Sequence, residues 1–369
     1  MKKDAIVPYS YLKEQFKNPK SLLKGIEKIV KEGDFTLGKR VELFEKKFAS
    51  FSQIKYAVGV GSGTAALHLA LEALEINGEV ITTPNTFFAT VNAIVAAGAK
   101  PVFVDVGEDY NINPNLIERT ITPRTQAIMP VHLTGRPADI RSIRDIAYKH
   151  GLAVIEDAAQ AIGAYTLGMH VGYFSNAAGF SFHPLKNLNV WGDAGMVATK
   201  DDNVYQRLLK LRNQGLSDRD NWAMYGHNHR IDPIQAYIGS ELISHTSQHT
   251  KKRISNARYY DHYLQNISFI TIPKRINCVK EVFHTYTIQA DKRDELQSYL
   301  LKNGIETKIH YPIPIHLQPA ARNLGYKAGD FPVAEEQAQR ILSLPIYPEL
   351  THDEVEEVIR GVKGFYGSM

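Results

Sequence analysis

The sequence predicts an α/β protein with a large, mostly parallel sheet covered by helices on both faces, followed by a smaller α+β unit. Two observations carry this prediction. Between residues 55 and 212, short apolar runs alternate with helical segments, which is typical of parallel strands joined by right-handed crossovers. After a long helix expected over 232–265, strands and helices no longer alternate regularly. We therefore expect a large domain over 1–240, including an N-terminal helical arm, and a small domain over 241–369.

The elements follow in order along the chain. Residues 21–51 carry apolar side chains at helical spacing and break at Gly33-Asp34, so two helices are expected. Strands of the large sheet are expected at 55–59, 79–82, 101–104, 127–131, 153–155, 178–182 and 196–199. Helices between them are expected at 64–74, 89–97, 140–150 and 201–212, and 213–230 is a polar surface excursion. The small unit should contain strands at 269–273 and 284–289 and helices at 293–303 and 353–362.

The composition excludes several classes of protein. The chain has 369 residues, of which 44% are hydrophobic and 22% charged, which is typical of a globular protein with ample core. Cys278 is the single cysteine, so no disulfide can form within the chain. The 43 basic and 39 acidic residues are interspersed, which does not favour nucleic acid. No export signal or membrane-spanning run is evident, and we expect a cytoplasmic protein.

A glycine-rich turn, Gly61-Ser62-Gly63-Thr64, lies between a predicted strand and a predicted helix. Unpaired amides at a helix N-terminus suit a phosphate group. The turn could also belong to a dinucleotide-binding fold or be only a tight turn. A dinucleotide fold requires an acid at the end of the next strand, but that strand ends at Thr82-Thr83. An NAD-dependent dehydrogenase therefore becomes the weaker alternative.

Asp157 and Lys186 each follow a predicted strand of the same sheet. An acid and a lysine converging near a phosphate cradle fit pyridoxal phosphate, because the lysine can form an imine and the acid keeps the ring nitrogen protonated. The alternative is a capping aspartate and a surface lysine. The histidines at 227 and 229 are spaced like a pair of metal ligands on a strand, but the sequence offers no third ligand, and no metal is expected.

The ordered segments of the chain closely resemble the DegT/StrS-type sugar aminotransferases. They read GSGTAALHLAL (61–71), TFFATVNAI (86–94), VHLTGRPADI (131–140), EDAAQAIGA (156–164), SFHPLKN (181–187), GDAG (192–195), YGHNHRI (225–231) and HYPIPIHLQPA (310–320). The resemblance implies a fold type I pyridoxal-phosphate enzyme with a seven-stranded sheet in its large domain.

The resemblance also implies a role for each matching residue. Lys186 matches the Schiff-base lysine, and Asp157 the partner of the pyridine nitrogen. The other cofactor-binding matches are Gly63, Thr64 and Ser181 at the phosphate, Phe87 on the ring, Gln160 near the phenolic oxygen, and Asn228, which implies a homodimer because it reaches the cofactor of the neighbouring subunit. The substrate-pocket residues implied are His183, Arg230, Tyr311 and His316.

We therefore expect an aminotransferase that moves an amino group from an amino acid, L-glutamate foremost, to a keto sugar. The loops at 192–195 and 310–316 look more like those of relatives that aminate carbon 3 of a nucleotide-linked hexose. A 4-keto nucleotide sugar is the second choice and a sugar phosphate the third. A cofactor-binding regulator without turnover is the alternative from another class. Cations for a diphosphate are sought among Lys39, Arg40, Arg212 and Arg230.

Overall fold

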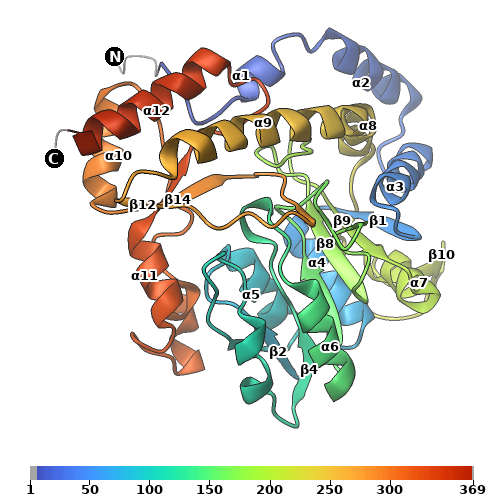
Figure 1. The fold of residues 1–369 in the computed structure, drawn as a ribbon. Coiled ribbons are helices and arrows are strands. Elements are labelled where there is room, and N and C mark those ends of the chain that lie inside the picture. The colour runs from blue at the N-terminus through green and yellow to red at the C-terminus, as the bar shows by residue number, and fades with distance from the viewer. Residues whose placement is uncertain (1–5, 368–369) are drawn as a thin grey trace.

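A seven-stranded sheet is the centre of the molecule, whose computed structural model describes residues 6–367 (Figure 1). Its strand order is β1-β9-β8-β5-β4-β2-β3. The strands are β1 Tyr56–Val60, β2 Glu79–Thr82, β3 Lys100–Phe103, β4 Thr125–Ile128, β5 Ala153–Asp157, β8 Ala177–Ser181 and β9 Gly195–Thr199. All neighbours from β3 to β8 are parallel, whereas β9 runs antiparallel to β8 and β1. The predicted, mostly parallel sheet is confirmed.

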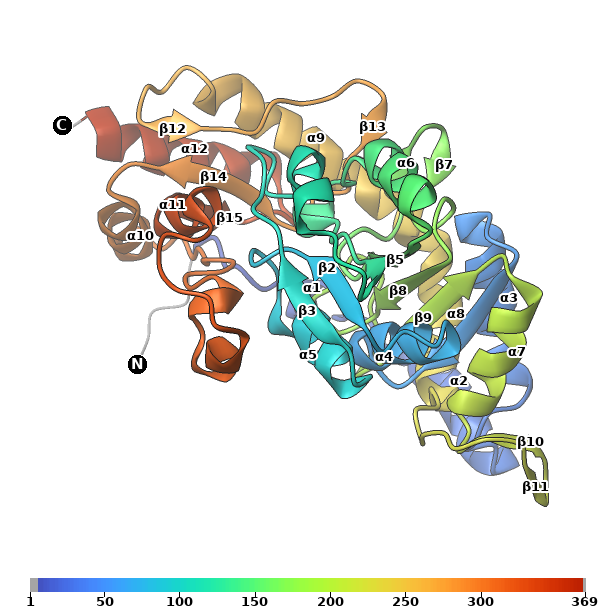
Figure 2. The same ribbon diagram turned by 90° about the horizontal axis from the view of Figure 1, so that it is seen from below.

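Helices cover both faces of this sheet (Figure 2). Successive strand residues point to opposite faces, and in β8 Ala177 packs into one core whereas Ala178 packs into another. The first core includes side chains from α4 Gly63–Ala73, α5 Phe88–Ala96 and α7 Asp202–Leu211. The opposite face packs against α3 Lys39–Ser52, α6 Ile140–His150 and α8 Pro233–Leu242. Strands buried on both sides explain the near-continuous apolar runs in the sequence.

The C-terminal part forms an α+β unit with its own core. A three-stranded antiparallel sheet is made of β12 Ile270–Thr271, β14 Tyr286–Ala290 and β15 Ile341–Leu344. The helices are α9 Thr246–Leu264, α10 Arg293–Lys302, α11 Pro332–Arg340 and α12 His352–Gly367. The N-terminal residues Val7 and Tyr11 pack into this core and not against the large sheet.

The continuous helix predicted over 232–265 is wrong. Helix α8 ends at Leu242, a 3-10 turn covers Ile243–His245, and α9 then begins at Thr246. The predicted domain boundary at residue 240 falls inside α8 and stays a prediction. By contrast, the break predicted at Gly33 is confirmed, because Gly33 ends α2 Lys20–Glu32 in the left-handed conformation at φ 68°.

The segment 213–230 leaves the body of the large unit as predicted. It contains a short hairpin of β10 Leu216–Asp218 and β11 Asn221–Trp222, which projects away from the other elements (Figure 2). Small elements that the sequence did not indicate are α1 Leu12–Gln15 and a minor sheet of β6 Tyr165–Thr166, β7 Met169–His170 and β13 Val279–Lys280.

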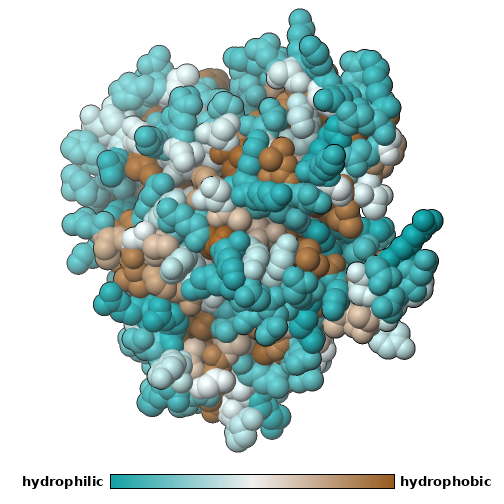
Figure 3. Space-filling view, turned by 90° about the vertical axis from the view of Figure 1, so that its right-hand side faces the viewer, coloured by the Kyte–Doolittle hydropathy of each residue, from teal (hydrophilic) through white to brown (hydrophobic). Residues whose placement is uncertain are grey.

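One face of the molecule is largely polar (Figure 3). Figure 3 shows one face, on which hydrophilic side chains dominate and hydrophobic ones occur in small, scattered patches. Cys278 is exposed. Within residues 6–367, no helix is both long enough and apolar enough to cross a bilayer. The expectation that the N-terminal segment is not an export signal concerns, in part, residues 1–5, which lie outside the described residues.

Candidate active site

A cavity of about 310 Å³ lies where β5 and β8 end and where α4 and α5 begin. Ligands of open α/β sheets bind at this edge, because the carboxyl ends of parallel strands meet there. The small unit closes part of the cavity with His284, His310 and Tyr311. The predicted site residues that line it are Gly63, Thr64, Phe87, Asp157, Gln160, Ser181, His183, Lys186 and Tyr311.

The start of α4 forms one end of the cavity. Ser62 caps the helix, since its hydroxyl accepts a hydrogen bond from the Ala65 amide at 3.1 Å. The first amides of a helix have no partner within it and attract an anion. Gly63 brings this turn against Ser181, because a Cβ added at position 63 would lie 2.7 Å from the Ser181 Cβ. A glycine, a helix N-terminus and two hydroxyl side chains thus make a phosphate-sized cradle.

Asp157 is the last residue of β5 and its side chain is buried. Thr90 donates a hydrogen bond to Oδ2 at 2.7 Å, and the Ala159 amide donates to Oδ1 at 3.1 Å. Burial raises the pKa of this carboxyl, whereas the two hydrogen bonds and the charge of Lys186 oppose the rise. Both oxygens are held in place, so the carboxylate can orient and charge-stabilise a protonated ring nitrogen.

The neighbouring residue holds the end of β5 in place. Glu156 accepts a 2.6 Å hydrogen bond from Nε2 of His132 and a 2.8 Å bond from the Gly172 amide. Nδ1 of His132 accepts from the Ala138 amide at 3.0 Å, so the ring is the Nε2–H tautomer. Burial acts to raise the pKa of Glu156, but the hydrogen bonds from His132, Ser175 and the Gly172 amide act in the opposite direction, and the pKa is lowered overall. This buried pair fixes the strand end that carries Asp157.

Lys186 lies in the turn after β8 and points into the same cavity. Its backbone amide donates to the His183 carbonyl at 2.8 Å, and the Lys186 carbonyl accepts a 3.4 Å hydrogen bond from the Tyr11 hydroxyl. Burial lowers the pKa of the amine to about 8, although the nearby Asp157 acts to raise it. A substantial fraction of the amine is therefore neutral near physiological pH and able to attack a carbonyl.

Aromatic and amide groups form another part of the cavity lining. The Phe87 side chain is 56% exposed, although it is large and apolar. Its ring lies 5.7 Å from that of Tyr311. Gln160 accepts a hydrogen bond from the Thr134 amide at 2.8 Å and donates to the Tyr311 hydroxyl at 3.5 Å. An exposed ring at the mouth of a cavity is suited to stack on a flat ligand.

These groups fit pyridoxal phosphate. The cradle at Gly63, Thr64 and Ser181 suits its phosphate, and the buried carboxylate of Asp157 suits its ring nitrogen. Lys186 is the amine that its aldehyde requires, and Phe87 offers a free aromatic face. The donor set therefore matches the group at four separate points.

Three predicted site residues do not line the cavity. His316 is buried; its Nε2 lies 3.0 Å from Oε1 of Glu335, and its ring packs edge-on to that of Phe331. Arg230 donates to the Asn213 side chain at 3.0 Å. Asn228 is exposed on the excursion 213–230.

Two of the cations sought for a diphosphate are already neutralised. Arg40 pairs with Glu32 and Asp34, and the buried Arg212 pairs with Glu45. Their contacts are those of structural ion pairs, since each guanidinium is already occupied by a carboxylate.

Sequence reasoning also left out residues that contribute to the cavity. Thr90, in the first turn of α5, supports Asp157 through its hydrogen bond, and no signal in the sequence singled it out. His284 and His310 come from the small unit and line the cavity; His310 precedes the predicted pocket residue Tyr311, whereas no sequence signal singled out His284. Burial lowers the pKa of His310 to about 4 and that of His284 well below its usual value, so both rings are neutral.

Comparisons with known proteins agree with this site. The model of the DegT/DnrJ/EryC1/StrS aminotransferase family matches residues 18–363. The chain is 42% identical, over 98% of both chains, to a "pleiotropic regulatory protein" of Geobacillus stearothermophilus. It is also 42% identical, over 91% of both, to a UDP-N-acetyl-3-dehydro-alpha-D-glucosamine 3-aminotransferase of Acidithiobacillus ferrooxidans.

Solved structures agree as well. The crystal structure of S. venezuelae DesV in complex with a ketimine intermediate superposes with a TM-score of 0.96 at 38% identity, and 99% of each chain is covered. The fold class expected from the sequence is confirmed. The chain belongs to the DegT/DnrJ/EryC1/StrS aminotransferase family.

Proposed function

We propose that the protein is a pyridoxal-phosphate-dependent aminotransferase that moves an amino group from L-glutamate to a nucleotide-linked 3-keto hexose in amino-sugar biosynthesis. The observation that carries the proposal is the meeting of Lys186, Asp157 and the α4 cradle in one cavity. When bound, the cofactor would supply an electron sink for the bond changes at the substrate carbon. The cytoplasm stays the predicted location.

Each residue has a defined task under this proposal. The Gly63, Thr64 and Ser181 cradle binds the phosphate and fixes the cofactor's position. Asp157 keeps a proton on the ring nitrogen, and Phe87 orients the ring by stacking. When the Lys186 amine is not bonded to the cofactor, its Nζ would take a proton from the substrate carbon that bears nitrogen and return it to the aldehyde carbon of the cofactor. A pKa of about 8 suits an amine that both accepts and donates a proton.

The 3-keto acceptor is supported by the loops at 192–195 and 310–316 and by the relative whose name places its amino group at carbon 3. His183 and Tyr311 line the cavity and are the residues proposed to contact the sugar. Arg230 and His316 do not line it. We propose that Arg230 contacts the nucleotide part of the substrate at the rim of the cavity. We also propose that His316 positions the loop 310–316, which carries Tyr311.

The test is the pair of half-reactions, followed by the absorbance of the bound cofactor. Excess L-glutamate should convert the cofactor to its amine form, and a panel of 3-keto and 4-keto nucleotide sugars is then offered to that form. Discharge by 3-keto sugars supports the proposal, and discharge by 4-keto sugars alone overturns the choice of carbon. Colourless protein that binds NAD would identify a dehydrogenase. Protein that holds the cofactor but reacts with no donor would identify a regulator, as the name of one relative suggests.

We further propose a homodimer in which Asn228 serves the neighbouring cofactor site. The segment 213–230 supports this, because Asn228 is exposed, does not line its own cavity, and lies near the exposed side chains Trp222 and Tyr225. Exposed aromatic side chains on a projecting segment are typical of an interface.

Mixing two inactive variants tests this arrangement. A heterodimer of Lys186→Ala and Asn228→Ala chains would contain one site with both residues intact, so activity should return on mixing. Lys186→Ala mixed with Asp157→Asn is the matched control and should stay inactive, since both changes affect groups from one chain. Failure of the first mixture to regain activity would place Asn228 outside the neighbouring site.

A further inference from the structure

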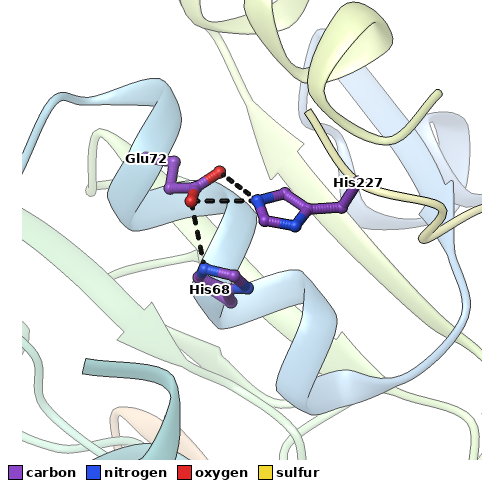
Figure 4. Close-up of side chains that lie close together, drawn as sticks. All are labelled: His68, Glu72 and His227. Carbon is purple, nitrogen blue, oxygen red and sulfur yellow. Dashed lines mark hydrogen bonds and ion pairs between the residues drawn. The ribbon is translucent and has the colours of Figure 1, made fainter. Parts of the chain in front are cut away.

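A second cluster of polar side chains lies away from the cavity, between α4 and the excursion 213–230 (Figure 4). Glu72 Oε1 lies 3.1 Å from Nε2 of His68, and the Nε2 of His227 lies 2.9 and 3.0 Å from the two Glu72 oxygens. The three potential ligand atoms all lie within 4.8 Å of one another. The sequence offered His227 without a third ligand, and folding brings one helix face against it.

The helix presents two of these groups together because His68 and Glu72 are four residues apart on α4. The side chains of His68, Glu72 and His227 are 11%, 26% and 35% exposed. The cluster is therefore partly removed from water but open on one side. Strong interaction with a cation requires such partial desolvation.

The Nε2 of His68 is buried and has no hydrogen-bond partner, although the Glu72 oxygen is within ion-pair distance. The two observations agree if the oxygen lies off the direction of an N–H bond. Buried polar atoms without a partner are rare and call for an explanation. A lone pair of this nitrogen directed at an ion between the three side chains is such an explanation.

Two imidazole nitrogens and one carboxylate oxygen are a donor set found in zinc sites. In a tetrahedral zinc site with metal–ligand distances of about 2.0–2.1 Å, the ligand atoms are about 3.3 Å apart. Oε1 of Glu72 lies 3.1 Å from Nε2 of His68 and 3.0 Å from Nε2 of His227, close to that separation. The His227 side chain is 35% exposed, and its ring centroid lies 4.8 Å from that of His68. A water molecule would fill the fourth position.

We propose that His68, Glu72 and His227 form a binding site for a divalent transition metal of the zinc class. The metal would clamp the excursion 213–230 to α4, the helix whose first turn lines the cavity. Its role would be structural, since the cluster contributes no side chain to the cavity. This proposal does not rest on the proposed function.

The experiment uses the tag-free, cofactor-loaded protein, treated with a chelator, equilibrated with zinc and desalted. Zinc per chain is measured by mass spectrometry, and the melting temperature is recorded with and without zinc. We expect about one zinc per chain and a zinc-dependent rise in melting temperature of several degrees. His227→Ala and Glu72→Gln should lose both the zinc and the rise.

The matched control is His352→Ala. His352 also lies four residues from a glutamate, at 3.4 Å from Glu356, but on an exposed helix face where no third His, Cys, Asp or Glu of residues 6–367 completes a metal-binding group. It should keep the zinc. Cobalt substitution of the wild-type protein gives a readout that needs no variant, because tetrahedral cobalt absorbs strongly in the visible range. Absence of zinc and of that absorption in wild-type protein, or equal zinc in the His227→Ala protein, would overturn the proposal.

Discussion

The buried amine of Lys186 should titrate far below an ordinary lysine. Burial lowers its pKa from 10.5 to about 8, against the opposing charge of Asp157. The difference corresponds to about 3 kcal/mol in favour of the neutral amine. At a pH of about 7.5, about a quarter of the amines would be neutral, compared with about one in a thousand at the ordinary pKa. The nucleophilic form is thus enriched by a few hundredfold.

Competitive labelling of the cofactor-free protein measures this directly. A small neutral acylating reagent is applied across a pH series, and modification of Lys186 is quantified by peptide mass spectrometry. The exposed Lys28 serves as the internal reference for the reagent, since its side chain is 74% exposed. We expect the modification of Lys186 to reach half its maximum near pH 8.

The Asp157→Asn protein gives the sign of the electrostatic contribution. The Asp157 charge raises the pKa of Lys186, so its removal should move the labelling midpoint to lower pH. A wild-type midpoint above about pH 10 would refute the argument from burial. A midpoint that rises in the variant would refute the assigned role of the carboxylate.

The remaining predictions concern the groups around this amine. Asp157→Asn should keep the cofactor bound but slow transfer on the order of a hundredfold or more, measured as kcat. Thr90→Val removes a hydrogen bond that lowers the pKa of Asp157, so that pKa should rise and the acid limb of the kcat profile should move to higher pH. Gly63→Ala should weaken cofactor retention in gel filtration, whereas Gly61→Ala, whose added Cβ would meet nothing nearer than 3.5 Å, should not. Glu156→Ala leaves the buried Nε2–H of His132 and the Gly172 amide without their acceptor and should lower the free energy of unfolding by about 2 kcal/mol or more in urea titrations; equal stability would contradict the role of that pair.

The large unit could be predicted from the sequence because its signals are local. Each buried strand is a short apolar run, and each crossover helix has a periodic face, so β2 and α6 were assigned with their observed bounds. Asp157 and Lys186 could be placed together for the same reason, since both follow strands of one parallel sheet. Chain order alone then brings them to the same edge.

The small unit could not be predicted as well, because its structure depends on contacts between residues far apart in sequence. Strand β15 pairs with β14, although α10, a long loop and α11 lie between the two strands in the sequence. The four residues of β15 alone do not distinguish a strand from a helix. Val7 joins the same core from the other end of the chain, where its backbone pairs with Ile305. The wall formed by His284 and His310 has the same origin.

Helix α4 connects the two proposed sites, and its burial makes that connection mechanical. Nearly every side chain from Ala65 to Leu71 is buried, so the helix cannot shift without disturbing the core on that face of the sheet. Its first turn faces the cavity, whereas His68 and Glu72 face the segment that carries Asn228. A metal at that face would restrict the segment and leave Lys186 untouched. If zinc is removed and the pH of half-maximal Lys186 labelling stays the same, the metal stabilises the segment without affecting the catalytic amine. A shift of that pH would mean that α4 itself moves.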